Sequence, residues 1–88
     1  MEKIKLVVVD DHPLFRQGVV DALSLEPDMT VIGQASSGEE ALEMIQALAP
    51  DVAVLDVNLP GMNGQQITHR VVQKKLKTRI LLLTGYDD

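Results

Sequence analysis

Residues 4–12 read I-K-L-V-V-V-D-D-H, a nearly unbroken β-branched run followed at once by two acids and a histidine. An apolar run of this kind, without alternation, is typical of a strand that is covered on both faces of a sheet. Pro13 follows directly, and proline is well suited to the first position of a helix. This stretch therefore predicts a buried strand over residues 4–9, a polar turn, and a helix that begins after His12.

The same alternation of apolar run and helical pattern continues outward along the chain. We expect further strands over residues 30–35, 52–57 and 79–83, a helix that starts at Gly38, and another from about residue 64 to residue 75. Ser37 and Glu40 have the spacing of a capping box, which sets the start of the middle helix. The order β-α-β-α-β-α-β predicts an α/β protein with a doubly wound parallel sheet, right-handed crossovers and helices on both faces.

Each predicted helix has one apolar stripe that should face the sheet. Gly18 lies inside the first helix, where glycine is unfavourable, so we expect close packing there. Pro50 is expected to close the second helix. The three stripes consist of Phe15, Val19, Ala22 and Leu23, then Ala41, Leu42, Ile45 and Leu48, then Ile67, Val71 and Val72.

Composition excludes several classes of function. The 88 residues have 45% apolar side chains but only one Phe, one Tyr and no Trp, so the core should be aliphatic. There is no cysteine, which excludes a disulfide, a thiolate nucleophile and a cysteine-bound zinc. No apolar run approaches the roughly 20 residues that span a bilayer. The net charge of −5 argues against tight binding to nucleic acid by these residues. We expect a cytoplasmic protein without a membrane segment.

The polar residues that interrupt or follow the buried strands are the candidate site. Asp10 and Asp11 follow the first strand, Asp56 lies near the carboxyl end of the third, and Thr84 follows the fourth. Ligands of open α/β sheets bind outside these strand ends. With the strand order 2-1-3-4, the first and third strands are neighbours, and three carboxylates would then face one crevice.

Three carboxylates in one crevice repel each other, which either raises the pKa of at least one of them or recruits a cation. Hard oxygen ligands favour Mg²⁺, which accepts phosphate oxygens readily. A carboxylate beside it can form an acyl phosphate, and the Thr84 hydroxyl can donate to a phosphoryl oxygen. The alternative is that Asp10 and Asp11 only form a turn before Pro13. Asp56 is harder to explain in that way, because it interrupts an apolar strand and has no basic neighbour in sequence.

These residues resemble the receiver domains of two-component response regulators. The resemblance rests on V-V-V-D-D-H-P-L-F-R-Q-G at residues 7–18, V-A-V-L-D-V-N-L-P-G-M-N-G at residues 52–64 and I-L-L-L-T-G-Y-D-D at residues 80–88. The first run is similar to the NarL/FixJ subgroup, whose members carry a C-terminal LuxR-type helix-turn-helix domain. The resemblance covers essentially all 88 residues. It implies a flavodoxin-like doubly wound sheet with the order 2-1-3-4.

The resemblance also implies roles for individual residues. Asp56 would accept a phosphoryl group from a sensor histidine kinase. The chain would then be a signalling domain that is itself phosphorylated, and not an enzyme. Asp11 and Asp56 would bind Mg²⁺ directly, Asp10 would bind it through water, and the backbone carbonyl of Asn58 would complete the protein ligands. Thr84 would be the switch hydroxyl that moves toward the phosphoryl group. Asn58 and Tyr86 would occupy the two variable positions that tune the lifetime of the phosphoryl group. Pro60 and Gly64 would shape the loop after the acceptor strand. His12 is interpreted as a helix-start residue beside the site, with a ligand role as the alternative.

Receivers of this family continue beyond the fourth strand with a fourth helix, a fifth strand and a fifth helix. The fifth strand ends in a lysine that pairs with the phosphoryl group. We therefore expect residues 1–88 to form a single, incomplete receiver domain that is poorly phosphorylated without that lysine. Contact with DNA would occur only through the missing output domain. The exposed edge of residues 80–83 favours self-association or a segment-swapped dimer.

Three other functions compete with this interpretation. A phosphatase with an aspartate nucleophile needs D-x-D after a buried strand, and the chain has Asp56-Val57-Asn58 there. A flavin-binding module needs a phosphate loop rich in Gly, Ser and Thr after the first strand, where this chain is acidic. A pseudo-receiver that acts only through protein contacts is disfavoured by the complete acidic triad, but it stays open for a chain of this length.

Overall fold

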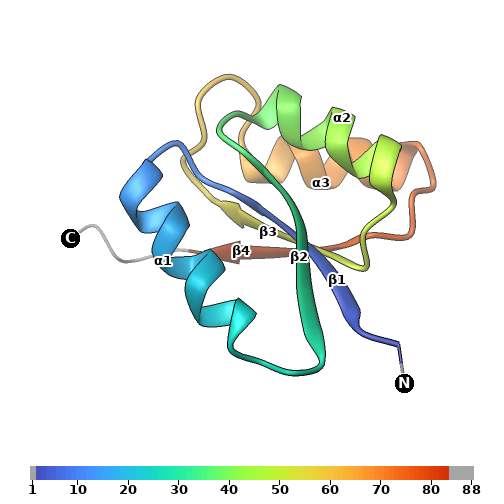
Figure 1. Cartoon of the computed structure of the whole chain (residues 1–88). Coiled ribbons are helices and arrows are strands. Elements are labelled where there is room, and N and C mark those ends of the chain that lie inside the picture. Colours follow the sequence, from blue (N-terminus) through green and yellow to red (C-terminus); the bar gives the residue numbers. More distant parts are fainter. Residues whose placement is uncertain (1, 84–88) are drawn as a thin grey trace.

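The structure is a computed structural model that describes residues 2–83. Within this range, four parallel strands alternate with three helices (Figure 1). The order of the strands across the sheet is β2-β1-β3-β4, as predicted. The elements are β1 (Ile4–Val9), α1 (Pro13–Ser24), β2 (Met29–Ala35), α2 (Gly38–Leu48), β3 (Val52–Asp56), α3 (Gly64–Gln73) and β4 (Arg79–Leu83).

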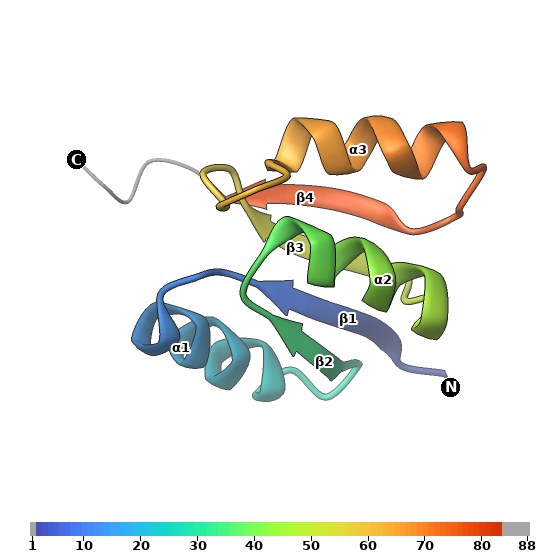
Figure 2. The ribbon, with the colours of Figure 1, turned by 90° about the horizontal axis from the view of Figure 1, so that it is seen from above.

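The helices lie on both faces of the sheet, which makes the fold doubly wound. Figure 1 shows α2 and α3 above the strands and α1 below them, and in the view from above in Figure 2 α2 lies in front of the sheet. The main core lies between the sheet and the α2–α3 layer and is entirely aliphatic. Its buried members are Val7, Val9, Ala35, Ala41, Leu42, Ile45, Ala53, Leu55, Leu59, Ile67 and Val71.

The register of the sheet decides which side chains meet at its carboxyl edge. β1 and β3 pair directly, with Val9 opposite Leu55. Asp10 is the residue after Val9, and Asp56 is the residue after Leu55. Both acids therefore leave the sheet at the same level on adjacent strands.

Several element boundaries differ from the prediction. β2 begins one residue earlier than expected, at Met29, and β3 ends at Asp56 rather than at Val57. α3 ends at Gln73 and not near residue 75, because Lys75 takes a left-handed conformation with φ of 57°. A helix cannot continue through such a residue.

The apolar stripe of α1 is less buried than its sequence suggested. No residue of this helix is fully buried, Phe15, Val19 and Leu23 are half-buried, and Ala22 is exposed. α1 packs mainly on β1 and β2, so much of its surface lies beyond the strands. Nothing described lies within 4 Å of a side chain added at Gly18, so the expected close packing there is absent from the described residues.

Two further side chains of the predicted stripes are exposed. Leu48 is 44% exposed and Val72 is 70% exposed, so neither side chain is buried in the core. Leu48 still lies over β2, where its Cδ1 would be 3.3 Å from a Cβ built at Gly33, but β2 is at the edge of the described sheet and leaves the rest of the side chain uncovered. Val72 lies at the margin of its stripe and points away from the sheet. Within residues 2–83, no helix has the length and apolar character that would let it cross a membrane.

The starts of α2 and α3 are both fixed by capping side chains. Ser37 Oγ accepts a hydrogen bond from the backbone N–H of Glu40, as predicted. The Glu40 carboxylate reaches one residue further back, however, and accepts from the N–H and the hydroxyl of Ser36. Asn63 and Gln66 form a complete capping box at the start of α3, which the sequence analysis did not identify.

Candidate functional site

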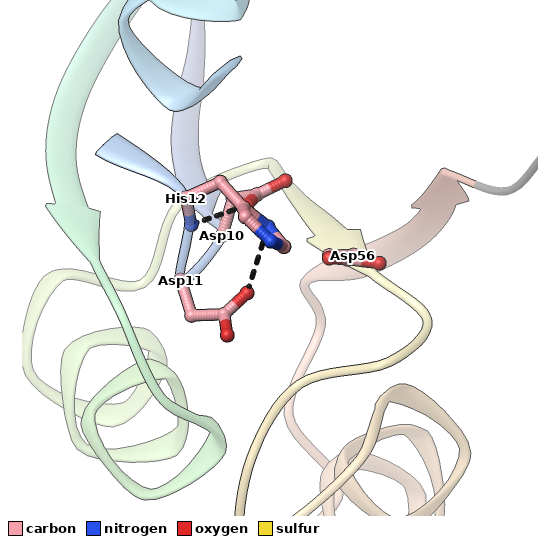
Figure 3. A group of neighbouring side chains, drawn as sticks. All are labelled: Asp10, Asp11, His12 and Asp56. Atoms are coloured by element: carbon pink, nitrogen blue, oxygen red, sulfur yellow. Dashed lines mark hydrogen bonds and ion pairs between the residues drawn. The ribbon is translucent and has the colours of Figure 1, made fainter. Parts of the chain in front are cut away.

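Four side chains that can bind a metal converge at the carboxyl ends of β1 and β3 (Figure 3). They are Asp10, Asp11 and His12, which follow β1, and Asp56, the last residue of β3. One ligand atom from each lies within 4.8 Å of the ligand atoms of the other three. The predicted meeting of the first-strand pair with Asp56 is therefore what the structure shows.

Two of the three carboxylates are almost completely removed from solvent. Asp10 and Asp56 are each 1% exposed, whereas Asp11 is exposed. Burial of a carboxylate is unfavourable unless hydrogen bonds or a cation compensate for the lost hydration. The pocket therefore concentrates negative charge, and its two buried carboxylates have little access to water.

Backbone N–H groups hold one oxygen of each buried carboxylate. Asp10 Oδ1 accepts from the N–H of His12 at 2.8 Å, and Asp56 Oδ1 accepts from the N–H of Asn58 at 3.0 Å. Both bonds link an Asp to the residue two positions later, which is the pattern of an Asx-turn. The turn-forming interpretation of Asp10 is therefore correct, but it accounts for only one of the two oxygens.

The second oxygen of Asp10 is not explained by the fold. Asp10 Oδ2 is buried and has no hydrogen-bond partner in the part of the chain that the structure describes. Nearly all buried polar atoms in proteins have a partner, so such an atom indicates a missing ligand, water or ion. A divalent cation with hydrating water satisfies an oxygen of this kind.

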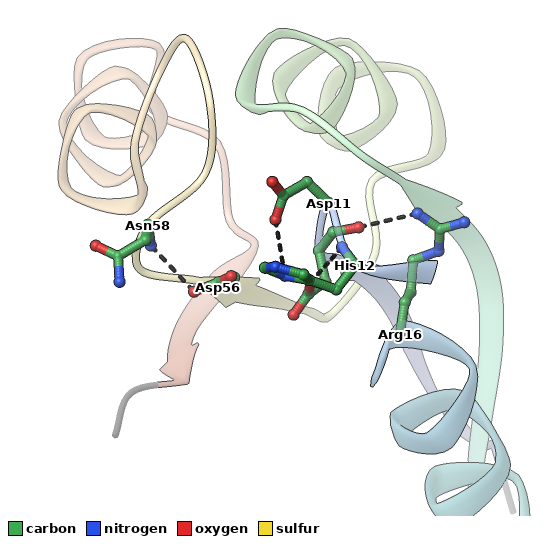
Figure 4. A network of polar contacts seen from close by, with 6 residues as sticks. Asp11, His12, Arg16, Asp56 and Asn58 are labelled. Carbon is green, nitrogen blue, oxygen red and sulfur yellow. Dashed lines mark hydrogen bonds and ion pairs between the residues drawn. The ribbon is translucent and has the colours of Figure 1, made fainter. Parts of the chain in front are cut away.

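His12 lies between the two acids of the first-strand turn. Its Nδ1 is 3.2 Å from Asp10 Oδ1 and 3.1 Å from Asp11 Oδ1 (Figures 3 and 4). The imidazole is 62% exposed, so it sits at the mouth of the pocket. The sequence placed His12 at the start of the helix, which is correct, but did not show that its ring contacts both acids.

Arg16 supports the strand end that carries Asp10. Its guanidinium donates from Nη1 to the backbone carbonyl of Asp10 at 2.9 Å (Figure 4). It also donates from Nε to Gln34 Oε1 at 3.2 Å. Arg16 thereby links α1 to β2 and fixes the end of β1. The sequence analysis did not assign a role to Arg16. Its position one helical turn after His12, facing back toward the strand end, was the available signal.

The loop that leads from β3 to α3, directly after Asp56, packs tightly against its neighbours. A side chain at Gly38, the first residue of α2, would overlap the backbone carbonyl of Met62 in this loop. Gly61 has φ of 72°, which favours glycine, and a side chain at Gly64 would collide with Leu82. The predicted role of Gly64 in shaping the loop is consistent with this contact, whereas the requirement at Gly38 was not predicted.

The remaining predicted residues are only partly described. The backbone N–H of Asn58 contacts Asp56, which places Asn58 at the rim of the pocket. Pro60 is exposed in the same loop. Thr84 and Tyr86 lie outside the described residues.

The fold and the site define a class of protein, a doubly wound α/β domain with a cluster of acidic side chains at the ends of β1 and β3. Residues 6–88 match the family described as response regulator receiver domain, and the chain belongs to this family. The match covers nearly the whole chain, which agrees with the resemblance noted from the sequence.

The chain is similar to regulators of the NarL type. It is 52% identical over 87 residues, 99% of this chain, to the "Probable transcriptional regulatory protein NarL" of Mycobacterium tuberculosis. It is 41% identical over 83 residues, 94% of this chain, to the nitrate/nitrite response regulator protein NarL of Escherichia coli K12. The chain spans 40% and 38% of the lengths of these two relatives.

A solved structure agrees with the fold. The signal receiver domain of NarL from Mycobacterium tuberculosis superimposes with a TM-score of 0.95 at 51% identity. This alignment covers 100% of the present chain and 71% of the solved one. The described strands and helices are therefore those of a receiver of the NarL type.

Proposed function

We propose that Asp56 is the phosphoryl acceptor of this chain and that the donor is a phosphorylated histidine of a sensor kinase. The observation that carries the proposal is the convergence of Asp10, Asp11 and Asp56 at adjacent strand ends, with their ligand atoms within 4.8 Å. Membership of the receiver family makes phosphoryl acceptance the chemistry to test first.

In the proposed reaction, a carboxylate oxygen of Asp56 attacks the phosphorus of the phosphohistidine. The new O–P bond forms as the N–P bond breaks, and the electron pair of that bond stays on the leaving imidazole. The hydrogen bond from the N–H of Asn58 to Asp56 Oδ1 orients the carboxylate within the pocket. The product is an acyl phosphate on Asp56.

The residues of the pocket fit a magnesium ion. The donors are hard oxygens, and the buried Asp10 Oδ2 lacks a hydrogen-bond partner among the described residues. Asp11 and Asp56 would hold the ion directly, Asp10 through water, and the backbone carbonyl of Asn58 would complete the set. When bound, the ion supplies positive charge that offsets the charge of the transferring group. Thr84 is proposed to donate its hydroxyl to the phosphoryl group.

The test is the incorporation of phosphate from acetyl phosphate, read by intact mass with and without Mg²⁺. We expect slow labelling that requires Mg²⁺ and is lost in Asp56→Asn. Asp51→Asn is the matched control, because Asp51 lies at the opposite end of β3 and is exposed. Labelling that persists in Asp56→Asn, or no labelling at saturating donor after prolonged incubation, would contradict the proposal. The second result would favour a module that acts through protein contacts alone.

The role of the whole protein is a proposal that extends from its relatives. The names of the two NarL proteins describe transcriptional regulation and response to nitrate or nitrite. We propose that residues 1–88 act as one receiver unit, not as an enzyme, and that phosphorylation controls an output region that contacts DNA. A cytoplasmic location, the sensor kinase as partner, and self-association of the chain remain predictions.

A further inference from the structure

We propose that His12 is a metal ligand, so that the acidic pocket binds divalent ions that favour imidazole nitrogen, such as Ni²⁺, in competition with Mg²⁺. This inference rests on the proposed metal site. It adds a ligand and a class of ion that an all-oxygen magnesium site does not provide.

The side chain of His12 is turned toward the acids rather than toward the helix that it precedes. His12 is the N-cap residue of α1, yet its side chain makes no capping hydrogen bond to this described helix. Its Nδ1 instead lies 3.2 Å from Asp10 Oδ1 and 3.1 Å from Asp11 Oδ1. Figure 3 shows the ring between these acids, on the side of the pocket that faces Asp56.

These separations match those between neighbouring ligands of one ion. Two atoms that each lie about 2.1 Å from a metal are about 3.0 Å apart at an octahedral angle and about 3.4 Å apart at a tetrahedral angle. The nitrogen–oxygen distances of 3.1 and 3.2 Å fall between these values. The full set of four ligand atoms, within 4.8 Å of one another, needs only a small contraction to surround one ion.

A second feature of the pocket also indicates a ligand. Asp10 Oδ2 is buried without a hydrogen-bond partner among the described residues, and Asp10 itself is 1% exposed. An acidic cluster alone would be satisfied by solvent, but this oxygen has little access to solvent. The pocket therefore contains both an unsatisfied oxygen and a nitrogen donor at its mouth.

The donor set selects a class of ion. Mg²⁺ prefers oxygen ligands and retains its waters, so it gains little from an imidazole. Imidazole suits Ni²⁺, Cu²⁺ and Zn²⁺, and the affinity of mixed nitrogen and oxygen sites rises from Co²⁺ through Ni²⁺ to Cu²⁺. Replacement of His12 should therefore weaken Ni²⁺ binding and leave Mg²⁺ binding nearly unchanged.

Calorimetric titration of the untagged 88-residue chain with Ni²⁺ and with Mg²⁺ tests this inference. The variants are His12→Gln and, as the matched control, His69→Gln, since the chain has two histidines and His69 is exposed on α3. We expect His12→Gln to lose at least about tenfold in Ni²⁺ affinity. His69→Gln should bind as the unmodified chain does, and added Mg²⁺ should weaken the binding of Ni²⁺. Circular dichroism establishes that the variants are folded.

A spectroscopic measurement separates ligation from an indirect effect. Co²⁺ is paramagnetic, so the ring protons of a bound histidine should show large hyperfine shifts, and those of His12 should shift while those of His69 do not. Equal Ni²⁺ affinity in His12→Gln, or an unshifted His12 ring, would overturn the inference. If Mg²⁺ still binds in that case, the proposed function stands. Failure of both ions to bind the unmodified chain would count against both proposals.

Discussion

Removal of the Asp10 charge should stabilise the metal-free protein and strongly reduce its response to Mg²⁺. Asp10→Asn keeps the shape of the side chain and an oxygen that can accept from the N–H of His12. It replaces the unsatisfied Oδ2 with an amide group that carries no charge and can donate to a neighbouring carboxylate. The substitution therefore relieves repulsion without creating a cavity.

The magnitude follows from the spacing of the carboxylates. Two unit charges 4.8 Å apart, the upper limit for the ligand atoms here, repel by about 3.5 kcal/mol at an effective dielectric constant near 20 and by about 0.9 kcal/mol in water. The backbone N–H of His12, which donates to Asp10 Oδ1, offsets part of this repulsion. We expect Asp10→Asn to raise the free energy of unfolding by about 1–3 kcal/mol in the absence of divalent ions.

The assay is thermal unfolding of both forms, first with a chelator and then with Mg²⁺. For a domain of this size, 1 kcal/mol corresponds to about 4–8 °C in the unfolding midpoint. Mg²⁺ at 100 times its dissociation constant should stabilise the unmodified chain by about 2.7 kcal/mol and the variant much less. Asp51→Asn, at the far end of the sheet, controls for the loss of one negative charge.

Two results would refute this reasoning. If Asp10→Asn destabilised the chelated protein, the carboxylate would contribute to the fold rather than oppose it. If the variant and the unmodified chain responded equally to Mg²⁺, the ion would bind somewhere other than the pocket formed by Asp10, Asp11 and Asp56.

Three other perturbations test the packing and the electrostatics around the pocket. Gly38→Ala should destabilise the chain by about 1–3 kcal/mol in urea unfolding, because its methyl group overlaps the loop after β3. Gly18→Ala, in open space within a helix, should stabilise the chain by up to about 1 kcal/mol. Equal effects of the two substitutions would contradict the structure. The backbone N–H of Ser36, followed by its hydroxyl, lowers the pKa of Glu40. The stabilisation from this contact is therefore complete above the ordinary pKa of a glutamate carboxyl group, and it is lost as the pH falls through the lowered pKa of the folded state. An NMR titration should show the Glu40 pKa returning toward its ordinary value in Ser36→Ala, and an unchanged value would disprove the role of the hydroxyl. Leu81→Lys should reduce self-association in sedimentation experiments, because Leu81 is 53% exposed on β4, the last described strand of the sheet.

The sequence predicted the part of the site that depends on strand topology. Parallel strands end at a common edge, so the strand order alone was sufficient to bring Asp10 and Asp56 together. The capping spacing of Ser37 and Glu40 also predicted the start of α2 correctly, because the Ser37 side chain caps the helix through a local hydrogen bond. Both features depend on regular backbone geometry, which short-range patterns describe well.

The features that were not predicted depend on tertiary contacts. The contact of the His12 ring with both acids is set by a side-chain rotamer, and the contact of Gly38 with Met62 is set by the path of a distant loop. The exposure of Leu48 also depends on tertiary packing. An apolar stripe shows which side of a helix faces the sheet, but it does not show how far the sheet extends beneath the helix. Such features follow from how the elements pack, which the spacing of residues along one element does not define.

The most direct test of the central claim is to locate a bound divalent ion by NMR with substoichiometric Mn²⁺. If Asp10, Asp11 and Asp56 form one site, the amide signals of residues 10–12 and 56–58 should broaden first, and added Mg²⁺ should restore them. Broadening centred on another part of the chain, or broadening that Mg²⁺ does not reverse, would contradict the account.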